Sequence, residues 1–334
     1  MRLVTFEIPT AIGPLQRIGV LSKDRIIDLN MGYSLYLAET RNRRRAQEIA
    51  NAILPANMLE FLRSGNEGKE AAQLTTEYVG TMLGKDSPTG PDGRRVAYEN
   101  TEVRLKSPVP RPNSLRDYLS FEEHASFGGQ RQLPQAWYEM PICYKGNVDT
   151  IIGPGDTIPW PSFCELLDYE LEYGIFISKA GTDIPREKAN EYIAGYTIFN
   201  DISARDIQMQ EMTCGLGPVK GKDTCSILGP CLVTPDEVNT QDMRMIARIN
   251  GEVWSDNNSG TSYWTWPEII EFASMDETLY PGDFLGSGTV GRGCGLELGK
   301  WIQPGDVIEL EVAGIGTVRN KVGAKPLAKR VFSR

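Results

Sequence analysis

Histidine is the scarcest reactive residue of this sequence, because His124 is the only one among 334 residues. Zinc sites usually draw on several histidines or on closely spaced cysteines. The six cysteines contain no C-x-x-C pair and are too few for a disulfide-rich scaffold, so we expect buried free thiols. The sequence therefore disfavours both a zinc centre and a disulfide framework.

Long apolar runs and concentrated positive charge are also missing. No stretch approaches the roughly 20 apolar residues of a membrane span, and the N-terminal segment lacks the apolar core of a signal peptide. The formal net charge is −9, and the only basic cluster, at 41–45, is interpreted as a solvated helix start. We therefore expect a cytoplasmic protein that binds neither nucleic acids nor membranes.

The residues that are present predict an α+β fold in two parts. Short alternating strands fill residues 3–30, and helical periodicity follows in 44–53, 57–65 and 69–83. A stretch rich in Gly, Pro and Asp at 83–103 then marks a boundary. We expect a small N-terminal α+β domain over 1–104 and a larger, mostly β domain over 105–334.

Turn signals support the strand content of the second part. Pro-Gly-Asp occurs at 154–156, 281–283 and 304–306, each time just ahead of a strand-like segment. Pro fixes φ for such a turn and Gly takes the positive φ. Asn-Gly at 250–251 predicts a hairpin, and the segment 265–275 predicts a helix that opens with a capping box.

One predicted strand carries acids at alternate positions, Asp168, Glu170 and Glu172. Alternation places the three side chains on one face, where each carboxylate disfavours the ionisation of its neighbour. The first interpretation is an exposed sheet edge with the acids in water. The second is a pocket wall that holds a hard divalent cation, Mg²⁺, Mn²⁺ or Ca²⁺, through carboxylate oxygens.

Other polar residues stand in settings that allow two interpretations each. Asp201 ends an apolar strand, where it can be a metal ligand, a helix N-cap or both. His124 follows Asp117 by seven residues and has Glu122 and Glu123 beside it, so it is either structural or a general base.

A lysine also invites two interpretations. Lys220 and Lys222 stand among glycines just before an apolar strand. Such a lysine could neutralise a developing oxyanion, or it could be an ordinary turn residue.

Several motifs together resemble the fumarylacetoacetate hydrolase family. They are DYELEYG, IFNDISARDIQ, KGKDTCSILGP and GSGTVGRGCGLEL, preceded by DYLSFEEHA and CYKGN. The resemblance covers about residues 105–334, and the first thirty residues are similar to the start of longer members. It implies a catalytic domain of the mixed β-roll kind and a homodimer.

The resemblance also implies a metal site. It assigns the metal-binding carboxylates to Asp117, Glu170, Glu172 and Asp201. Asp168 is expected to lie outside the set of direct ligands. The cofactor implied is Mg²⁺ or Mn²⁺, with Ca²⁺ as a further candidate.

The same resemblance assigns catalytic and substrate-binding roles. It makes His124 the base that activates water and Lys222 the residue that helps to hold the oxyanion of the substrate. The residues that it places around the substrate are Tyr144, Arg205, Gln208 and Thr289.

The sequence departs from the family at the carboxylate that pairs with the histidine. Cys294 stands near the expected position, and Glu297 follows somewhat later. We predict that Glu123 or Glu122 orients the imidazole of His124 instead, with Glu297 as the second choice.

The expected function is a metal-dependent hydrolase. It would cleave a carbon–carbon bond in a 1,3-diketo or acylpyruvate-type acid similar to fumarylacetoacetate or fumarylpyruvate, with water activated by His124. The first alternative is decarboxylation or keto–enol isomerisation of an oxaloacetate-like 2-oxo acid at the same site. The second is a catalytically silent binding paralogue, against which the retained acids argue because an idle row of buried carboxylates is costly.

Overall fold

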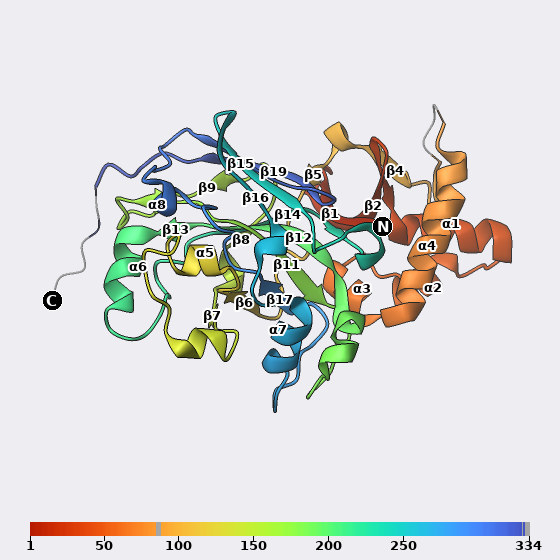
Figure 1. Cartoon of the computed structure of the whole chain (residues 1–334). Helices are drawn as coiled ribbons and strands as arrows, with labels where there is room; N and C mark the ends of the chain where they lie inside the picture. Colours follow the sequence, from red (N-terminus) through yellow and green to blue (C-terminus); the bar gives the residue numbers. More distant parts are fainter. Residues whose placement is uncertain (85–87, 329, 331–334) are drawn as a thin grey trace.

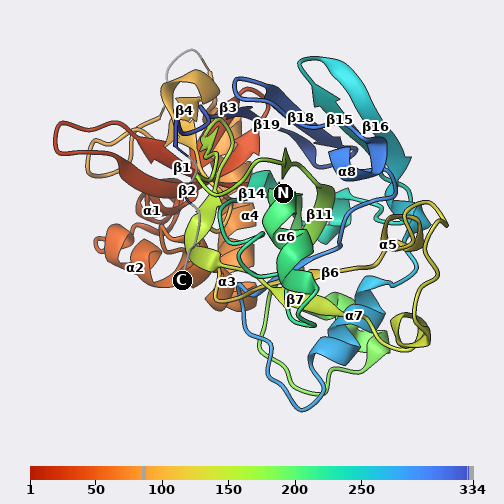
Figure 2. The ribbon, with the colours of Figure 1, turned by 90° about the vertical axis from the view of Figure 1, so that its left-hand side faces the viewer.

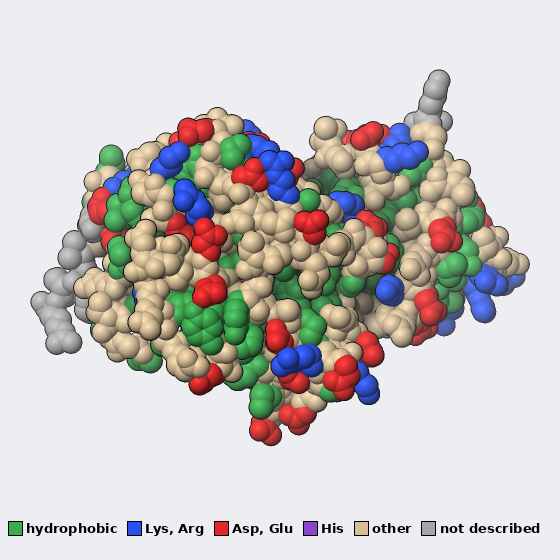
Figure 3. All heavy atoms as spheres, in the orientation of Figure 1, with side chains coloured by type: hydrophobic (Ala, Val, Ile, Leu, Met, Phe, Trp, Pro, Cys, Tyr) green, Lys and Arg blue, Asp and Glu red, His purple; other side chains and the backbone are tan. Residues whose placement is uncertain are grey.

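The structure is a computed structural model that describes residues 1–84, 88–328 and 330. It shows a mixed α/β fold, as predicted, in which helices α1 to α4 gather at one end and the larger sheets fill the rest (Figure 1). Figure 3 shows acidic and basic side chains interspersed over one face. Within the described ranges, no helix combines the length and the apolar character that a membrane crossing requires.

In its described residues, 1–84 and 88–104, the N-terminal part has five strands and four α-helices. The strands are β1 (Arg2–Ile8), β2 (Leu15–Ser22), β3 (Arg25–Asp28), β4 (Ala97–Glu99) and β5 (Arg104–Leu105). The helices are α1 (Leu29–Arg41), α2 (Ala46–Ile53), α3 (Met58–Arg63) and α4 (Gly65–Met82). The strands predicted in 3–30 and the three predicted helices are confirmed.

Helix α1 was not predicted. Its carboxylate cap, Asp28, accepts a hydrogen bond of 3.0 Å from the backbone N–H of Met31, and the first seven residues of the helix are all buried. Because these residues are buried on every side, the helix has no polar face. The sequence therefore lacks the helical periodicity of apolar and polar residues by which a helix is predicted. The basic cluster at 41–45 is exposed and leads into a helix, as predicted: it runs from the last residue of α1 to Arg45, the N-cap of α2.

The second part is built mainly from strands. They are β6 (Leu115–Tyr118), β7 (Cys143–Lys145), β8 (Ile151–Ile152), β9 (Thr157–Ile158), β10 (Leu167–Asp168), β11 (Leu171–Ile177), β12 (Ile193–Asp201), β13 (Ser203–Ala204), β14 (Ser226–Val233), β15 (Arg244–Ile249), β16 (Glu252–Asn258), β17 (Phe284–Gly286), β18 (Val307–Val312) and β19 (Gly316–Val322). The helices are α5 (Glu122–Ala125), α6 (Arg205–Met212), α7 (Trp266–Ala273) and α8 (Gly295–Leu298).

One large sheet runs through both parts. Its order is β4-β3-β2-β1-β14-β12-β11-β17-β6-β7, with β5 on β1 and β8 on β14. The antiparallel pair of β1 and β14, in which Leu3 faces Leu232, continues the sheet across the division that we propose at 104/105. A second sheet has the order β16-β15-β18-β19-β9, and β10 pairs with β13.

Two hydrophobic cores hold these layers. One lies between the large and the five-stranded sheet and includes Ile175 of β11, Met245 of β15 and Leu310 of β18. The other packs α1 to α4 against the N-terminal strands and reaches Phe176 and Phe199 of the central strands. The helices therefore brace strands that carry the acidic residues described below.

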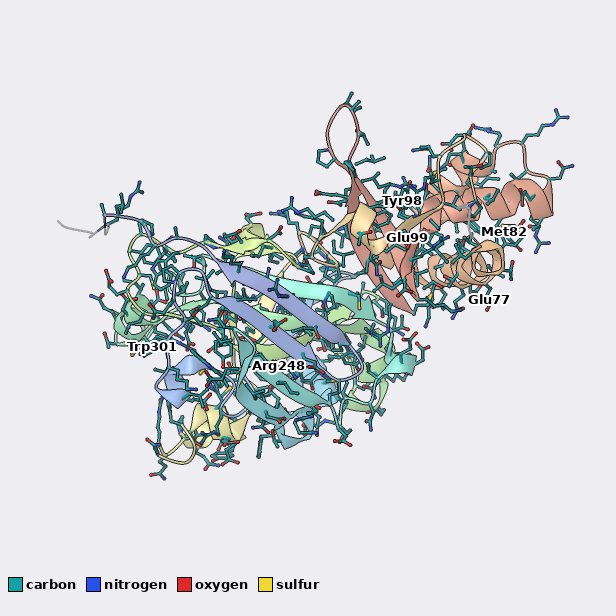
Figure 4. The ribbon with its side chains drawn as sticks, turned by 90° about the horizontal axis from the view of Figure 1, so that it is seen from above. Glu77, Met82, Tyr98, Glu99, Arg248 and Trp301 are labelled. Atoms are coloured by element: carbon teal, nitrogen blue, oxygen red, sulfur yellow. The ribbon has the colours of Figure 1, made fainter. Side chains whose placement is uncertain are left out.

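The views from other directions separate the two ends of the molecule. From above, Tyr98 of β4 and Met82 of α4 lie at the N-terminal end, away from Arg248 of β15 and from Trp301 (Figure 4). Figure 2 shows α5, α6 and β7 on the side that faces away from α1 to α4. Residues of these three elements, as shown next, surround one cavity.

The predicted turns are confirmed. Asn250 and Gly251 have φ values of 52° and 83° and connect β15 to β16, as expected for a two-residue hairpin loop. The glycines of the three Pro-Gly-Asp triplets all have positive φ, between 76° and 92°. The predicted helix is α7, and its capping box between Thr265 and Glu268 is present.

Candidate active site

Four buried carboxylates meet at the centre of the large sheet. Asp117 lies in β6, Glu170 just before β11, Glu172 within β11, and Asp201 at the end of β12. Strand β17 pairs with both β6 and β11, and β11 pairs with β12, so the sheet order brings these acids together. One oxygen of each lies within 4.8 Å of the others. The structure thus brings together the four residues that the resemblance assigned to a metal.

The alternative of an exposed acidic edge was wrong. Asp168, Glu170 and Glu172 have at most 3% of their surface exposed, and Tyr169 and Leu171 between them are buried as well. Both faces of this segment are therefore covered, because β11 is an inner strand of the sheet rather than an edge.

The hydrogen bonding of the carboxylates leaves two oxygens unpaired. Thr289 Oγ1 donates to Glu172 Oε1 over 2.9 Å, and the hydroxyl of Tyr144 donates to Asp201 Oδ2 over 2.6 Å. In contrast, Glu172 Oε2 and Asp201 Oδ1 are buried without a hydrogen-bond partner. Since unpaired buried oxygens are costly, the four acids fit a hard divalent cation that would satisfy them. They form a candidate metal site.

Burial and neighbouring charges shift the pKa values of the four carboxylates in different directions. Burial, reinforced by the nearby acids, raises the pKa of Asp117 and of Glu172 well above the usual range. Burial also raises the pKa of Asp201 to about 6, against the lowering effect of Lys222. Burial is the largest influence on Glu170 and opposes its ionisation, but Lys222 and Arg205 together outweigh it, so the pKa of Glu170 is lowered.

These shifts predict a pH-dependent response to metal. The folded metal-free protein protonates Asp201 near pH 6, whereas an unfolded aspartate does so near about pH 4. This protonation stabilises the metal-free fold at low pH, and its contribution is lost as pH rises through about 6. A cation needs the ionised form, so the increase in Tm on adding Mn²⁺ should be large above pH 7 and should shrink below about pH 6.

Thermal unfolding with and without Mn²⁺, between about pH 5 and about pH 8, measures this response. An increase in Tm that is the same throughout that interval would contradict the protonation of the site.

Two cations border the cluster. Lys222 Nζ donates to Asp201 Oδ2 over 2.6 Å and also contacts Glu170. Arg205 donates to Asp168 through Nε over 2.9 Å and contacts Glu170 Oε1 through Nη2 at 2.8 Å. Counting Asp168, five carboxylates lie beside these two cationic side chains, so the fully ionised cluster has an excess of negative charge that a dication would neutralise.

Asp168 lies outside the metal cluster, as expected. Besides its contacts with Arg205, its carboxylate accepts backbone hydrogen bonds of 2.8 Å from Gly295 and 3.0 Å from Leu296. It therefore anchors Arg205 and the start of α8 beside the site.

The single histidine pairs with a glutamate that is distant in the sequence. His124 Nδ1, on α5, lies 2.8 Å from Oε2 of Glu297, on α8. The prediction that Glu123 or Glu122 orients the ring was wrong, because adjacent residues of a helical turn point in different directions. Glu122 instead accepts a hydrogen bond of 2.6 Å from the hydroxyl of Tyr138.

Glycines next to β17 permit close packing around Asp117. A Cβ on Gly286 would lie 2.5 Å from Asp117 Oδ1, and one on Gly288 would lie 2.2 Å from the carbonyl oxygen of Tyr118. Gly288 also has a φ of +80°, and its N–H donates to Asp117 Oδ1 over 3.1 Å. The Gly-Ser-Gly segment thus shapes the site through its missing side chains.

Comparison with known proteins decides the family. The family model described as fumarylacetoacetate (FAA) hydrolase, C-terminal, matches residues 114–323. The chain belongs to the fumarylacetoacetate hydrolase family. Among relatives in this family, the oxaloacetate tautomerase YisK of Bacillus subtilis is 30% identical over 81% of this chain and 87% of its own. A mitochondrial oxaloacetate tautomerase of Bos taurus is 30% identical over 96% of this chain and 91% of its own.

Solved structures show that the fold is that of the fumarylacetoacetate hydrolase family. The maleylpyruvate hydrolase of Sphingobium sp. SYK-6, solved with manganese(II) and pyruvate, covers 98% of this chain and is itself covered completely, with a TM-score of 0.68 at 22% identity. The fumarylacetoacetate hydrolase of Exiguobacterium antarcticum covers 97% of this chain and is also covered completely, with a TM-score of 0.68 at 24% identity.

In this family member Asp117 and Glu170 of the acidic cluster open, together with the histidine, onto one cavity of about 440 Å³. His124, Glu170 and Lys222 line it. All four residues assigned to the substrate site line it as well, namely Tyr144, Arg205, Gln208 and Thr289. Sequence reasoning missed the apolar part of the wall, which is formed by Phe127, Ile142, Met209, Met212 and Leu296. In the sequence, only the spacing of three residues between the two methionines of α6 indicated an apolar wall, because residues three apart share one face of a helix.

Proposed function

We propose that this protein is a metal-dependent enzyme that cleaves a carbon–carbon bond in an acylpyruvate or other 1,3-diketo acid by hydrolysis. One observation carries the proposal: His124, which pairs with Glu297, lines the same cavity as Lys222 and as Asp117 and Glu170 of the four-carboxylate cluster. A base, a cation site and a positive side chain are the groups that such a hydrolysis needs.

Asp117, Glu170, Glu172 and Asp201 would hold the cation, as oxygen ligands that suit Mg²⁺ or Mn²⁺, with Ca²⁺ as a further candidate. When bound, such a cation supplies Lewis-acid stabilisation of the negative charge that develops on a 2-oxo acid as it enolises. The complex of the Sphingobium hydrolase with manganese and pyruvate supports this choice of ion and of substrate class.

The protein's own residues divide the remaining work. Glu297 accepts a hydrogen bond from Nδ1–H of His124, which leaves Nε2 unprotonated and able to take a proton from water. Lys222, held by Asp201 and Glu170, places a fixed positive charge at the cavity wall. Arg205 and Gln208, joined by a hydrogen bond of 2.9 Å, offer donors for the carboxylate of the substrate.

A second candidate function is keto–enol tautomerisation of an oxaloacetate-like acid. Two relatives that are 30% identical over most of this chain are named oxaloacetate tautomerases, which favours it. In that reaction His124 would move a proton between carbon and oxygen of the substrate instead of taking one from water. Decarboxylation of the same acid is the third outcome to measure.

One assay separates these reactions. The protein is supplied with Mg²⁺ or Mn²⁺ and offered acylpyruvates, fumarylpyruvate, fumarylacetoacetate and oxaloacetate. Hydrolysis releases a carboxylic acid together with pyruvate or another ketone product, decarboxylation releases carbon dioxide, and tautomerisation changes only the enol absorbance. If the protein turns over oxaloacetate alone, the proposed hydrolysis is contradicted and tautomerisation or decarboxylation takes its place as the proposed function. If it turns over none of these substrates, the result supports a binding paralogue.

Glu297→Gln is expected to lower turnover about 10²-fold, in the range that general acid–base catalysis contributes. The amide keeps the size of the side chain but is a poorer acceptor for His124 Nδ1–H. Glu123→Gln is the matched control, because Glu123 packs against Gly291 and makes only a contact of 3.5 Å with Asn257. Steady-state kinetics at saturating Mg²⁺ measure both, and equal turnover of the two variants would contradict the assignment of Glu297.

We also propose that the enzyme is a homodimer, as the resemblance to the family implies. Light scattering of the purified protein tests this, and a monomeric mass with full activity would contradict it.

A further inference from the structure

A second cluster of metal-binding groups lies behind His124. Glu297 Oε2 is shared between His124 Nδ1 at 2.8 Å and Cys294 Sγ, which donates to it over 3.2 Å. One ligand atom of each residue lies within 4.8 Å of the other two. The three side chains come from α5, α8 and the loop before α8, so they are neighbours only in the folded protein.

The donor atoms of this cluster differ from those of the four-carboxylate site. Oxygen ligands alone suit Mg²⁺ or Mn²⁺, whereas a thiolate, an imidazole and a carboxylate suit Zn²⁺ and similar softer ions. We propose that Cys294, His124 and Glu297 form a second site, selective for a thiophilic divalent cation such as Zn²⁺.

The geometry is close to what such an ion requires. Zinc bonds of about 2.0–2.3 Å in a tetrahedron place neighbouring ligand atoms about 3.3–3.6 Å apart. The two measured separations, 2.8 Å and 3.2 Å, are therefore within about half an ångström of a zinc site. Glu297 is also fixed by the N–H of Arg292, which donates to Oε1 over 3.0 Å. Only small side-chain movements separate the hydrogen-bonded state from a metal-bound one.

The charge and proton balance also fits. Cys294 releases its proton to solvent and becomes a thiolate, while His124 moves its proton from Nδ1 to Nε2, so one proton leaves for each cation bound. A thiolate and the carboxylate of Glu297 then neutralise a dication, which limits the cost of placing it in a buried position. Cys294 has no exposed surface, and burial raises the pKa of its thiol, so the proton remains until a cation displaces it.

Access to the site runs through the substrate cavity. His124 and Leu296 line that cavity, Glu297 contacts His124, and the side chains of Glu297 and Cys294 are almost fully covered. A cation at this site would remove both Nδ1 and Glu297 from their mutual hydrogen bond. Zinc should therefore inhibit the enzyme reversibly. This inhibition rests on the proposed role of His124, whereas the binding of zinc does not.

The binding test uses Co²⁺ as a spectroscopic substitute for zinc. The starting protein is the double variant Cys143→Ser/Cys214→Ser, because these two thiols are exposed and would bind soft ions nonspecifically. Saturating Mg²⁺ occupies the carboxylate site. We expect a thiolate-to-cobalt charge-transfer band that saturates at one equivalent and disappears when Zn²⁺ is added.

Two further variants in the same background identify the ligands. Cys294→Ser should abolish the band while keeping a hydrogen-bond donor to Glu297, and His124→Ala should weaken cobalt binding at least about tenfold. His124→Ala keeps the test decisive if the serine variant fails to fold. Absence of the band in the starting protein, or its survival in Cys294→Ser, would overturn the site.

Zinc inhibition supplies a second, separate readout. With Mg²⁺ saturating, zinc should inhibit the Cys143→Ser/Cys214→Ser protein, and adding Cys294→Ser should raise the half-inhibitory zinc concentration at least about tenfold. Each variant is compared with its own zinc-free rate. If zinc inhibits the proteins with and without Cys294→Ser at the same concentration, inhibition through this site is contradicted. If no substrate is turned over, the proposed function fails, while the cobalt spectrum still decides the site.

Discussion

Glu172→Gln should abolish activity at low Mg²⁺ while leaving the protein folded. The amide keeps the size of the side chain and an oxygen that can accept from Thr289, but it removes one of four charges from the candidate metal site. We expect metal affinity to fall by about 10²-fold or more, which exceeds the effect of losing a residue that only hydrogen-bonds to a metal ligand. Like-charge repulsion with Asp117 also falls, so the metal-free variant should unfold at a Tm no lower than that of the wild type.

Calorimetric titration with Mn²⁺ and turnover at limiting Mg²⁺ measure this prediction. Asp168→Asn is the control, because it removes a buried charge from the same segment but outside the cluster. It breaks the pair with Arg205 and should lower the free energy of unfolding by about 3 kcal/mol, while Mn²⁺ still raises its Tm. Full activity after exhaustive chelation would refute the metal assignment.

His124→Ala should lower turnover by about 10²–10⁴-fold, which is the usual contribution of a positioned base. Folding and Mg²⁺ binding should be nearly unchanged, since the side chain lies on the short helix α5, is 12% exposed and is not one of the four carboxylates. Turnover at saturating Mg²⁺ and a separate metal titration measure the two effects independently.

Glu122→Gln serves as the control for this variant. Glu122 stands on the same helix, is exposed and bonds only to Tyr138 among the contacts described here, so its turnover should stay within about twofold of wild type. Near-wild-type turnover of His124→Ala would exclude hydrolysis through this base. It would also exclude a tautomerisation in which His124 carries the proton, and would leave decarboxylation or enolisation that depends on the carboxylate site alone.

Local patterns in the sequence predicted much of the fold. Strand alternation in 3–30, the Pro-Gly-Asp turns and the Asn-Gly hairpin are properties of a few adjacent residues, and the structure shows them all. Helix α1 escaped prediction because its burial hides the usual polar face. The alternation of acids at 168–172 left exposure and burial equally open, and the position of β11 inside the sheet decided between them.

The residues of the candidate site that lie in local sequence motifs could be predicted. Those that join the site through tertiary contacts could not. The acids, Lys222 and the residues assigned to the substrate followed from the resemblance. In the structure the four acids lie together, and Asp117 and Glu170 line one cavity with Lys222 and the assigned substrate residues. The partner of His124 did not follow, because Glu297 is 173 residues away and reaches the ring only through the packing of α8. For the same reason the sequence disfavoured zinc, whereas the fold places a cysteine and a glutamate beside the single histidine.

The pairing of β1 with β14 constrains the order in which the chain can fold. Residues 2 and 233 are partners, so the first strand leaves the ribosome long before its neighbour has been synthesised. Until then β1 can pair with β2 and, at Phe6 and Glu7, with β5, but the part of its edge at Arg2 and Leu3 stays open to association with other chains. Asp117 in β6 is joined to the other acids through β17 (Phe284–Gly286), which pairs with both β6 and β11, so the acidic cluster can assemble only late. Slow synthesis or heat stress should therefore favour aggregation through this edge before the active centre has formed.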